Sequence, residues 1–252
     1  MRPKLLFYCL LLVIICIILS GCSYFSDAKE CRKVSEPYVR EYFGDDVCFV
    51  QHKSSGWFQS LDTDEYYVRS NGVLFEVILR KDGDRWAVGR DEYYCRYIKM
   101  IADSYISKLF QEKIDHFQKV YAGFYPRMIS LDDCPSLGTT PSLQQYQETC
   151  DAEFSAYFHV THVPQTEEEM QAEAELISDS LNILWNDSNV TWNTFYIWYE
   201  EGAYEWYIKY RRTDDCSTDC IFSSLKELKR KYERDMKKTS TPLLRSADLY
   251  RR

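Results

Sequence analysis

Thiols and imidazoles are the side chains of this sequence best suited to chemistry. A cysteine thiolate is a nucleophile, and a neighbouring histidine can activate it. The candidates are seven cysteines and four histidines: Cys31, Cys48, Cys95, Cys134, Cys150, Cys216 and Cys220, with His52, His116, His159 and His162. Because catalytic partners can meet in space while lying far apart in sequence, a hydrolase with a spatially assembled Cys–His site is one hypothesis.

Disulfides are an alternative use of the same thiols. Seven cysteines follow Cys22. Because seven is an odd number, at least one of them has no disulfide partner within the chain. We expect disulfides between Cys134 and Cys150, which bracket a loop, and between Cys216 and Cys220. In reducing surroundings all seven would remain thiols. A metal held by the last pair would need two further ligands, and no CxxC motif or histidine pair accompanies it, so neither metal nor cofactor is predicted.

Catalytic signatures are absent from the sequence. It has no GxSxG, HExxH or glycine-rich phosphate loop, and no SxxK with its partner motifs. His159 and His162 are three residues apart, and such positions on a strand point to opposite faces. Asp132-Asp133 falls in a predicted loop, and the three acids of residues 167–169 fall in the first turn of a predicted helix, where they complement its dipole. The sequence therefore predicts a non-enzymatic protein.

The N-terminus has the organisation of a secretory signal. Arg2 and Lys4 precede an uncharged run over residues 5–19 that is rich in leucine and isoleucine. At about 1.5 Å per helical residue the run reaches about 22 Å, less than a hydrocarbon core of about 30 Å. We expect residues 1–21 to be a signal peptide.

The signal ends in Leu19-Ser20-Gly21-Cys22, which closely resembles the lipobox of bacterial lipoproteins. In that family the cysteine is acylated and a peptidase cuts before it, which implies that Cys22 is the lipid-bearing first residue of the mature chain. Two or three acyl chains suffice for stable anchoring. The alternative is an uncleaved signal-anchor helix over residues 5–25. Both place the remaining chain on the extracytoplasmic face of the cell membrane.

Charge is distributed unevenly along the chain. Removal of residues 1–21 changes the formal net charge from −8 to −10. Residues 226–252 carry ten basic and four acidic side chains, which leaves −16 on residues 22–225. An acidic body argues against nucleic acid as a partner. The basic stretch fits a solvated helix face and tail, or contact with anionic lipid or wall polymer.

Residues 22–129 predict a first α+β module. Residues 28–43 have a helical pattern, and residues 46–89 have the pattern of strands, with a hairpin turn at Asn71-Gly72. A single apolar stripe over residues 92–113 predicts a helix that covers this sheet.

Trp57 and Phe58 lie in the segment Ser54-Ser-Gly-Trp-Phe58, between two predicted strands. We expect them either to contact a ligand or to anchor the loop. The layout before them, a short helix ending in Tyr-Phe-Gly and then a strand, is similar to uncharacterised small lipoproteins of Gram-positive bacteria over residues 28–118. That resemblance implies no activity.

A linker or long loop is predicted over residues 130–148, because proline and glycine there interrupt both the helical and the strand-like spacing of apolar residues. A second module follows over residues 149–238, and a disordered basic tail over residues 239–252. Its predicted elements are a strand over 152–163, a helix capped by Thr166 and Glu169, a hairpin over 192–212 and a helix over 217–237.

Sequential hairpins between helices predict an α+β fold, with two small modules of antiparallel hairpins packed against helices. The 21 tyrosines, 13 phenylalanines and 6 tryptophans fit half-exposed sheets. We expect a lipid-anchored binding module that contacts a protein, a peptide or an envelope polymer through an aromatic sheet surface. The alternatives are an immunity-type lipoprotein that neutralises a toxin at the cell surface, and the hydrolase considered above.

Overall fold

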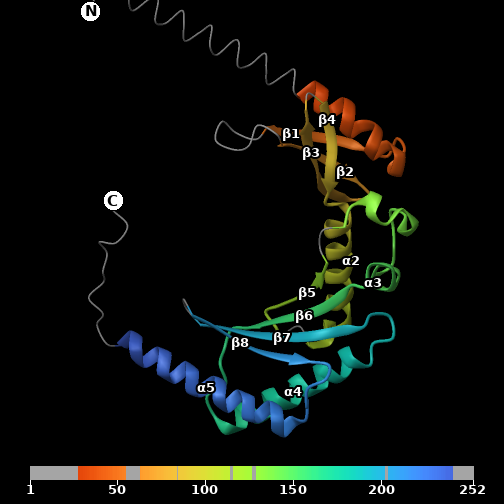
Figure 1. Ribbon diagram of the computed structural model, residues 1–252. Coiled ribbons are helices and arrows are strands. Elements are labelled where there is room, and N and C mark those ends of the chain that lie inside the picture. Colours follow the sequence, from red (N-terminus) through yellow and green to blue (C-terminus); the bar gives the residue numbers. More distant parts are fainter. Residues whose placement is uncertain are drawn as a thin grey trace, which may run out of the picture. The chain divides into compact units, whose positions relative to one another are not determined.

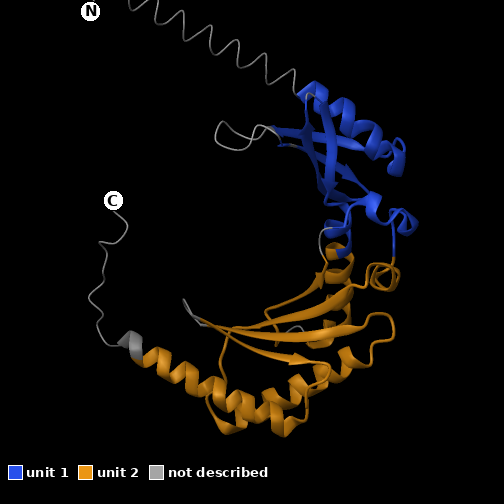
Figure 2. Cartoon of the chain, in the orientation of Figure 1, with its two compact units in different colours: residues 1–98, 127–141 blue, residues 99–126, 142–252 orange. Residues whose placement is uncertain are grey.

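The computed structural model of the chain describes residues 28–54, 63–83, 85–113, 116–126, 129–201 and 204–240. The chain forms two compact units (Figure 2). Unit 1 comprises residues 1–98 and 127–141, and unit 2 comprises residues 99–126 and 142–252. The units therefore interleave along the chain, whereas the sequence predicted consecutive modules over 22–129 and 149–238.

Unit 1 contains a four-stranded antiparallel sheet and the helix over residues 28–43 (Figure 1). Its strands, in sheet order, are β1 (Cys48–Ser54), β2 (Thr63–Ser70), β3 (Val73–Asp82) and β4 (Arg85–Asp91). The predicted turn between β2 and β3 is confirmed, because Asn71 and Gly72 adopt φ angles of 49° and 74°. Positive φ at both central residues is what a tight type I′ hairpin requires.

The core of unit 1 lies on one face of β3. Alternate β3 residues are buried: Val73, Phe75, Val77 and Leu79. The ring of Phe75 packs 5.8 Å from Phe43, at the end of the helix over residues 28–43, and 5.1 Å from Tyr93. Tyr93 begins α2 (Tyr93–Leu109), so the cover comes from both helices and not from the predicted 92–113 helix alone. Only residues 93–98 of α2 belong to unit 1.

The segment predicted as a linker over residues 130–148 is structured. It contains two short 3-10 helices, η2 (Leu131–Asp133) and η3 (Pro135–Leu137), and most of α3 (Leu143–Cys150). Residues 127–141 belong to unit 1, where the buried carboxylate of Asp91 accepts the backbone N–H of Leu131 at 2.8 Å. Side-chain contacts of this kind are not visible in a local sequence pattern, which explains the wrong linker prediction.

Unit 2 contains the second four-stranded sheet. Its strands, in sheet order, are β5 (Lys119–Tyr125), β6 (Glu153–Val160), β7 (Trp192–Glu201) and β8 (Tyr204–Arg211). The β6–β7 pair is parallel and is connected through α4 (Glu167–Trp185), while β5–β6 and β7–β8 are antiparallel. Helices α4 and α5 (Thr218–Ser240) pack together on one side of the sheet (Figure 1). The 3-10 helix η1 (Gln111–Lys113) follows α2.

The start of α4 agrees with the predicted capping box. Thr166 accepts the backbone N–H of Glu169 at 3.1 Å, and the Glu169 carboxylate accepts the N–H of Thr166 at 3.1 Å. The buried face of α4 is apolar except at Glu173 and Ser180, and it includes Met170, Ala174, Ile177, Leu181 and Leu184. These side chains form the core of unit 2 with inward residues of β6 and β7.

The fold is α+β, as the sequence predicted, with helices packed against two sheets. The parallel β6–β7 pair was not predicted, and it requires the crossover that α4 supplies. No helix in the described ranges combines the length and apolar character needed to cross a membrane. The signal peptide, the lipobox with Cys22, Trp57, Phe58 and residues 241–252 lie outside the described residues.

Candidate functional site

The sheet of unit 2 has two different faces, because side chains alternate along each strand. One face is buried under α4 and α5 and carries residues such as Phe154, Phe158 and Phe195. The opposite face is half-exposed and rich in rings. We call it the aromatic face, and it consists of Tyr121, Tyr157, His159, Tyr196, Trp198 and Tyr207.

Three tyrosines form a stacked ladder across β5, β6 and β7. The rings of Tyr121 and Tyr157 lie 5.0 Å apart and 4° from parallel, and those of Tyr157 and Tyr196 lie 4.7 Å apart and 4° from parallel. Strand register produces this arrangement, since Tyr157 pairs with Tyr121 on one side and Tyr196 on the other. The face of each ring packs against the face of a neighbouring ring, so the ring edges and hydroxyl groups point away from the stack.

Lysines lie at both ends of the tyrosine ladder. The ammonium group of Lys119 is 4.9 Å and that of Lys99 is 5.0 Å from the ring centroid of Tyr121. At the other end, Lys209 of β8 lies 5.1 Å from the ring centroid of Tyr196. Each contact is a cation–π interaction, which stabilises the stack and keeps positive charge at its ends.

A second row of rings runs beside the ladder. His159 stacks on Trp198, with centroids 6.2 Å apart and planes 9° apart, and Trp198 lies 4.9 Å from Tyr207. Tyr207 is 55% exposed, the most accessible of the large side chains on this face. The two rows together cover all four strands.

A hydrogen-bonded chain of Tyr121, His159 and Glu200 joins the two rows. The Nε2 atom of His159 lies 3.2 Å from the hydroxyl oxygen of Tyr121, and its Nδ1 atom contacts the Glu200 carboxylate. A carboxylate oxygen only accepts, so Nδ1 donates, and in a neutral imidazole Nε2 then accepts the Tyr121 proton. This chain fixes the orientation of both rings.

The electrostatics of Tyr121 fit a hydrogen-bond donor and not a nucleophile. Burial raises the pKa of Tyr121, and the neighbouring Tyr157 and the Glu200 carboxylate raise this pKa further. A phenol with a raised pKa keeps its proton at neutral pH, whereas a phenolate nucleophile needs a lowered pKa. Tyr121 therefore acts as a hydrogen-bond donor in this chain.

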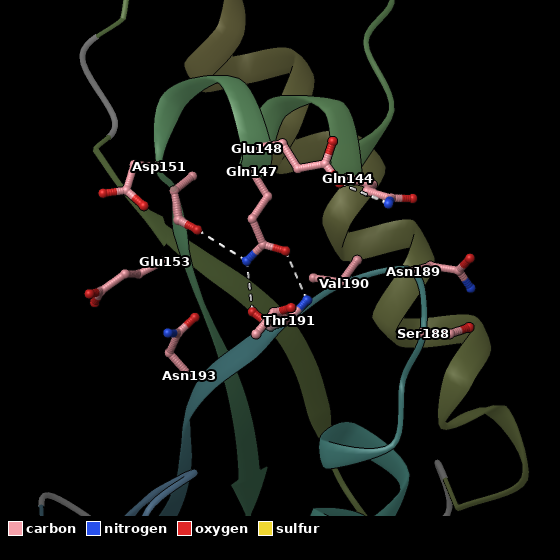
Figure 3. Close-up of a pocket in the computed structure, with 11 residues that line it drawn as sticks. Gln144, Gln147, Glu148, Asp151, Glu153, Ser188, Asn189, Val190, Thr191 and Asn193 are labelled. Atoms are coloured by element: carbon pink, nitrogen blue, oxygen red, sulfur yellow. Dashed lines mark hydrogen bonds between the residues drawn. The ribbon is translucent and has the colours of Figure 1, made fainter.

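A separate polar pocket of about 330 Å³ lies where α3 meets the start of β7 (Figure 3). Gln147 occupies its centre, and its amide nitrogen donates to the carbonyls of Ala152 at 3.1 Å and Thr191 at 2.8 Å. Its amide oxygen accepts the N–H of Thr191 at 2.8 Å. Because these bonds are with backbone groups, we assign Gln147 a structural role.

The four cysteines of the two predicted disulfides lie in both units. Cys134 lies between η2 and η3 in unit 1, and Cys150 is the last residue of α3 in unit 2. Their pairing stays a prediction. Cys216 and Cys220 are free thiols in the structure, and Cys216 donates to the carbonyl of Asp214 at a distance of 3.5 Å.

Three histidines lie beside carboxylates. His159 contacts Glu200, while His116 lies 2.7 Å from Glu173, and His162 lies 3.8 Å from Glu169. His159 and His162 therefore have different carboxylate partners. Within the described ranges, no cluster of three or more histidine, cysteine, aspartate or glutamate side chains could hold a metal ion.

Sequence reasoning missed most of the aromatic face. It predicted the hairpin over residues 192–212, which carries Tyr196, Trp198 and Tyr207, but it did not predict β5, which carries Tyr121. The available signal was the alternation in Lys119-Val-Tyr-Ala-Gly-Phe-Tyr125, where Ala122 and Phe124 are buried and Tyr121 is half-exposed. Gly123 obscures this signal, because glycine is depleted in strands.

Comparison with known proteins gives a distant structural likeness. No family model and no curated protein matches the chain. A crystal structure of a DUF5037 family protein from Ruminococcus gnavus ATCC 29149 is similar at 12% sequence identity, with a TM-score of 0.42. The match covers 76% of this chain and 97% of that chain. A likeness at this level carries no functional conclusion.

Proposed function

We propose that this protein is a lipid-anchored, non-catalytic binding module on the extracytoplasmic face of the cell membrane. The anchor is the acylated Cys22, and the binding surface is the aromatic face of unit 2. The observation that carries the proposal is the tyrosine ladder with its terminal lysines. It lies on the face opposite the one that α4 and α5 cover, and Figure 1 shows these two helices on one side of the sheet.

The orientation of the rings favours an anionic ligand. An aromatic ring has a negative face and a positive edge. In the ladder the faces of Tyr121, Tyr157 and Tyr196 are occupied by neighbouring rings or ammonium groups, so the rings turn their positive edges outward. Flat stacking of a sugar or a nucleobase needs a free ring face, which the central Tyr157 does not offer.

The cations at the ladder ends favour an extended ligand with several charges. Three strand spacings, about 14 Å, separate β5, which carries Lys119, from β8, which carries Lys209. Both Lys119 and Lys209 are exposed. Arg211 adds a third exposed cation on the same face of β8, while Glu200 and Glu205 lie at the other end of the β7–β8 hairpin. Of the ligands that the sequence suggested, an anionic envelope polymer fits this layout best.

The binding experiment uses inorganic polyphosphate as an anionic probe and dextran as a neutral control. We expect binding of polyphosphate that weakens as salt concentration rises, because exposed charges are screened. The double variant Lys119→Gln/Lys209→Gln should raise Kd about tenfold, since two exposed charge contacts contribute about 0.5–1 kcal/mol each.

The matched control is Lys33→Gln/Lys81→Gln, which removes the same charge from unit 1 and should leave Kd unchanged. Equal losses in the two double variants would attribute binding to net charge alone. Polyphosphate binding that survives Lys119→Gln/Lys209→Gln at full strength would contradict the proposed surface.

The anchor is tested separately. We expect mass spectrometry of the membrane-extracted protein to find residue 22 at the N-terminus with fatty acids attached, and Cys22→Ser to abolish acylation. An intact Met1 would instead support the uncleaved signal-anchor helix. Failure of the anchor would leave the binding surface of unit 2 untouched, so the two parts of the proposal can fail independently.

The two alternatives have less support. In the hydrolase hypothesis a histidine activates a thiol, but His116, His159 and His162 lie beside carboxylates. The immunity hypothesis is a special case of surface binding, and a toxin gene beside the gene of this protein would favour it.

A further inference from the structure

A second set of titratable side chains lines a pocket of about 270 Å³ in unit 2, beside α4. The pocket is distinct from the aromatic face and does not depend on the function proposed for that face. Its walls are apolar at Val160, Pro164 and Leu176. Its polar groups are two glutamates and two histidines: Glu169, Glu173, His116 and His162.

Helical spacing places both carboxylates in the pocket. Glu169 and Glu173 are four residues apart on α4, and Leu176 follows three residues later, so all three lie on one stripe of the helix. The histidines come from the segments before β5 and after β6. Carboxylates and apolar side chains therefore converge at one opening.

Glu173 is the unusual member of this set. Its side chain is only 6% exposed, and its two oxygens have separate partners. Oε1 accepts the hydroxyl proton of the buried Tyr199 at 2.9 Å, and Oε2 lies 2.7 Å from Nε2 of His116. Among the described residues, no lysine or arginine forms an ion pair with Glu173. A buried carboxylate ordinarily has a permanent cationic partner.

Glu169 provides a second acceptor at the pocket rim. Its Oε2 atom accepts the backbone N–H groups of Gln165 at 2.6 Å and Thr166 at 3.1 Å, and it is the atom closest to His162. These backbone bonds lower the pKa of Glu169, so the carboxylate stays ionised. All three contacts are on Oε2, which leaves Oε1 for another donor.

We propose that this pocket binds a small primary amine with a short aliphatic body. The ammonium group would replace the His116 imidazole at Oε2 of Glu173 and donate a second hydrogen bond to Oε1 of Glu169. An ammonium group is cationic throughout the neutral range, whereas an imidazole changes charge there. The aliphatic body would lie against Val160, Pro164 and Leu176.

The probe is butylammonium chloride, with 1-butanol as the neutral analogue and sodium butyrate as the anionic one. The full chain in detergent micelles, labelled with ¹³C at histidine, reports binding through its imidazole resonances. We expect butylammonium to shift the His116 and His162 resonances saturably, and 1-butanol and butyrate to leave them in place.

Two substitutions should act in opposite directions. Glu173→Gln removes the charge but keeps the shape, and it should weaken butylammonium binding about 10- to 100-fold, the effect of a lost charge-assisted hydrogen bond. His116→Ala removes the competitor for Oε2, and it should strengthen binding. Glu168→Gln, an exposed change in the first turn of α4, is the matched control and should have no effect.

Three results would overturn the proposal. A response to 1-butanol equal to that of butylammonium would show an apolar crevice only. Unchanged affinity in Glu173→Gln would exclude the buried carboxylate as the recognition group. Loss of binding in a folded His116→Ala protein would show that the imidazole is part of the site and not a competitor; this variant also keeps the test decisive if Glu173→Gln fails to fold.

Discussion

Gly123 lies directly under the ring of Tyr157: a Cβ atom at position 123 would be 2.6 Å from Cε2 of that ring. The two residues are on neighbouring strands, where Gly123 pairs with Ser155, two residues before Tyr157. The missing side chain allows the Tyr157 ring to lie over β5 and to stack between Tyr121 and Tyr196.

Gly123→Ala should therefore disrupt the tyrosine ladder. The added methyl group cannot coexist with the Tyr157 ring in its present position, and overpacking of this kind costs about 1–3 kcal/mol. We expect a lower free energy of unfolding in urea and a reduced near-ultraviolet circular dichroism signal from the stacked rings. Ser155→Ala on the adjacent strand is the control and should leave both nearly unchanged.

A double substitution checks the cause. Replacing Tyr157 by valine removes the ring atoms that meet the new methyl group. Gly123→Ala should then lower the free energy of unfolding much less in the Tyr157→Val background than in the wild type. Equal costs in the two backgrounds would attribute the effect to the strand backbone instead.

Asp91 should be a critical residue for the stability of unit 1. Its carboxylate accepts the hydroxyl proton of Tyr38 at 2.5 Å and the N–H groups of Tyr93 and Leu131 at 2.8 Å each. Asp91→Asn turns one acceptor into a donor that faces other donors, so we expect a loss of about 1–3 kcal/mol in the free energy of unfolding. Asp82→Asn, at the exposed end of β3, is the control, and an equally small effect of both would contradict the argument.

The contributions of Asp91 and Glu169 to the free energy of unfolding should change in opposite directions as pH falls. Burial raises the pKa of Asp91 above its ordinary 3.8, so the folded protein binds this proton more tightly than the unfolded chain. Its contribution to stability is complete below pH 3.8 and is lost as pH rises through the raised pKa. The pKa of Glu169 is lowered below 4.5 by backbone N–H groups, so its contribution is complete above pH 4.5 and is lost as pH falls through the lowered pKa.

Urea unfolding between about pH 3 and about pH 7 measures these signs. The stability difference between wild type and Asp91→Asn should be largest at the acidic end and shrink as pH rises. The difference between wild type and Glu169→Gln should be largest at neutral pH and shrink as pH falls. A common direction for both variants would refute the assignment.

Cys216 should react slowly with alkylating reagents. Burial raises the pKa of its thiol, and the thiolate is the reactive form. Cys48 is exposed on β1. We expect iodoacetamide to label Cys48 first in the folded protein, as peptide mass spectrometry can follow. Labelling of Cys216 and Cys220 only after addition of a reductant would instead establish the disulfide that the sequence suggested.

Local patterns predicted much of the fold. The buried alternation of Val73, Phe75, Val77 and Leu79, the turn at Asn71-Gly72 and the capping of α4 by Thr166 each depend on residues close in sequence. For that reason the element types and the fold class could be derived without a structure.

Long-range contacts limited the prediction of the units and of the site. Residues 130 and 131 join unit 1 through hydrogen bonds with Asp91, about 40 positions earlier. The spacing of apolar residues along the sequence gives no sign of such a contact. Strand β5 contains Gly123, and the reason for a glycine at this position becomes clear only from the Tyr157 ring that lies above it. The ladder itself depends on the register of three strands, and register is a tertiary property.

The order of the chain has a consequence for any attempt to separate the two units. The polypeptide passes from one unit to the other after residues 98, 126 and 141, and the first of these passages lies inside α2. A protease cut inside α2, after residue 98, would leave residues 127–141 of unit 1 joined by peptide bonds to unit 2. Protein nicked at that point should therefore migrate as a single species until a denaturant separates the two fragments.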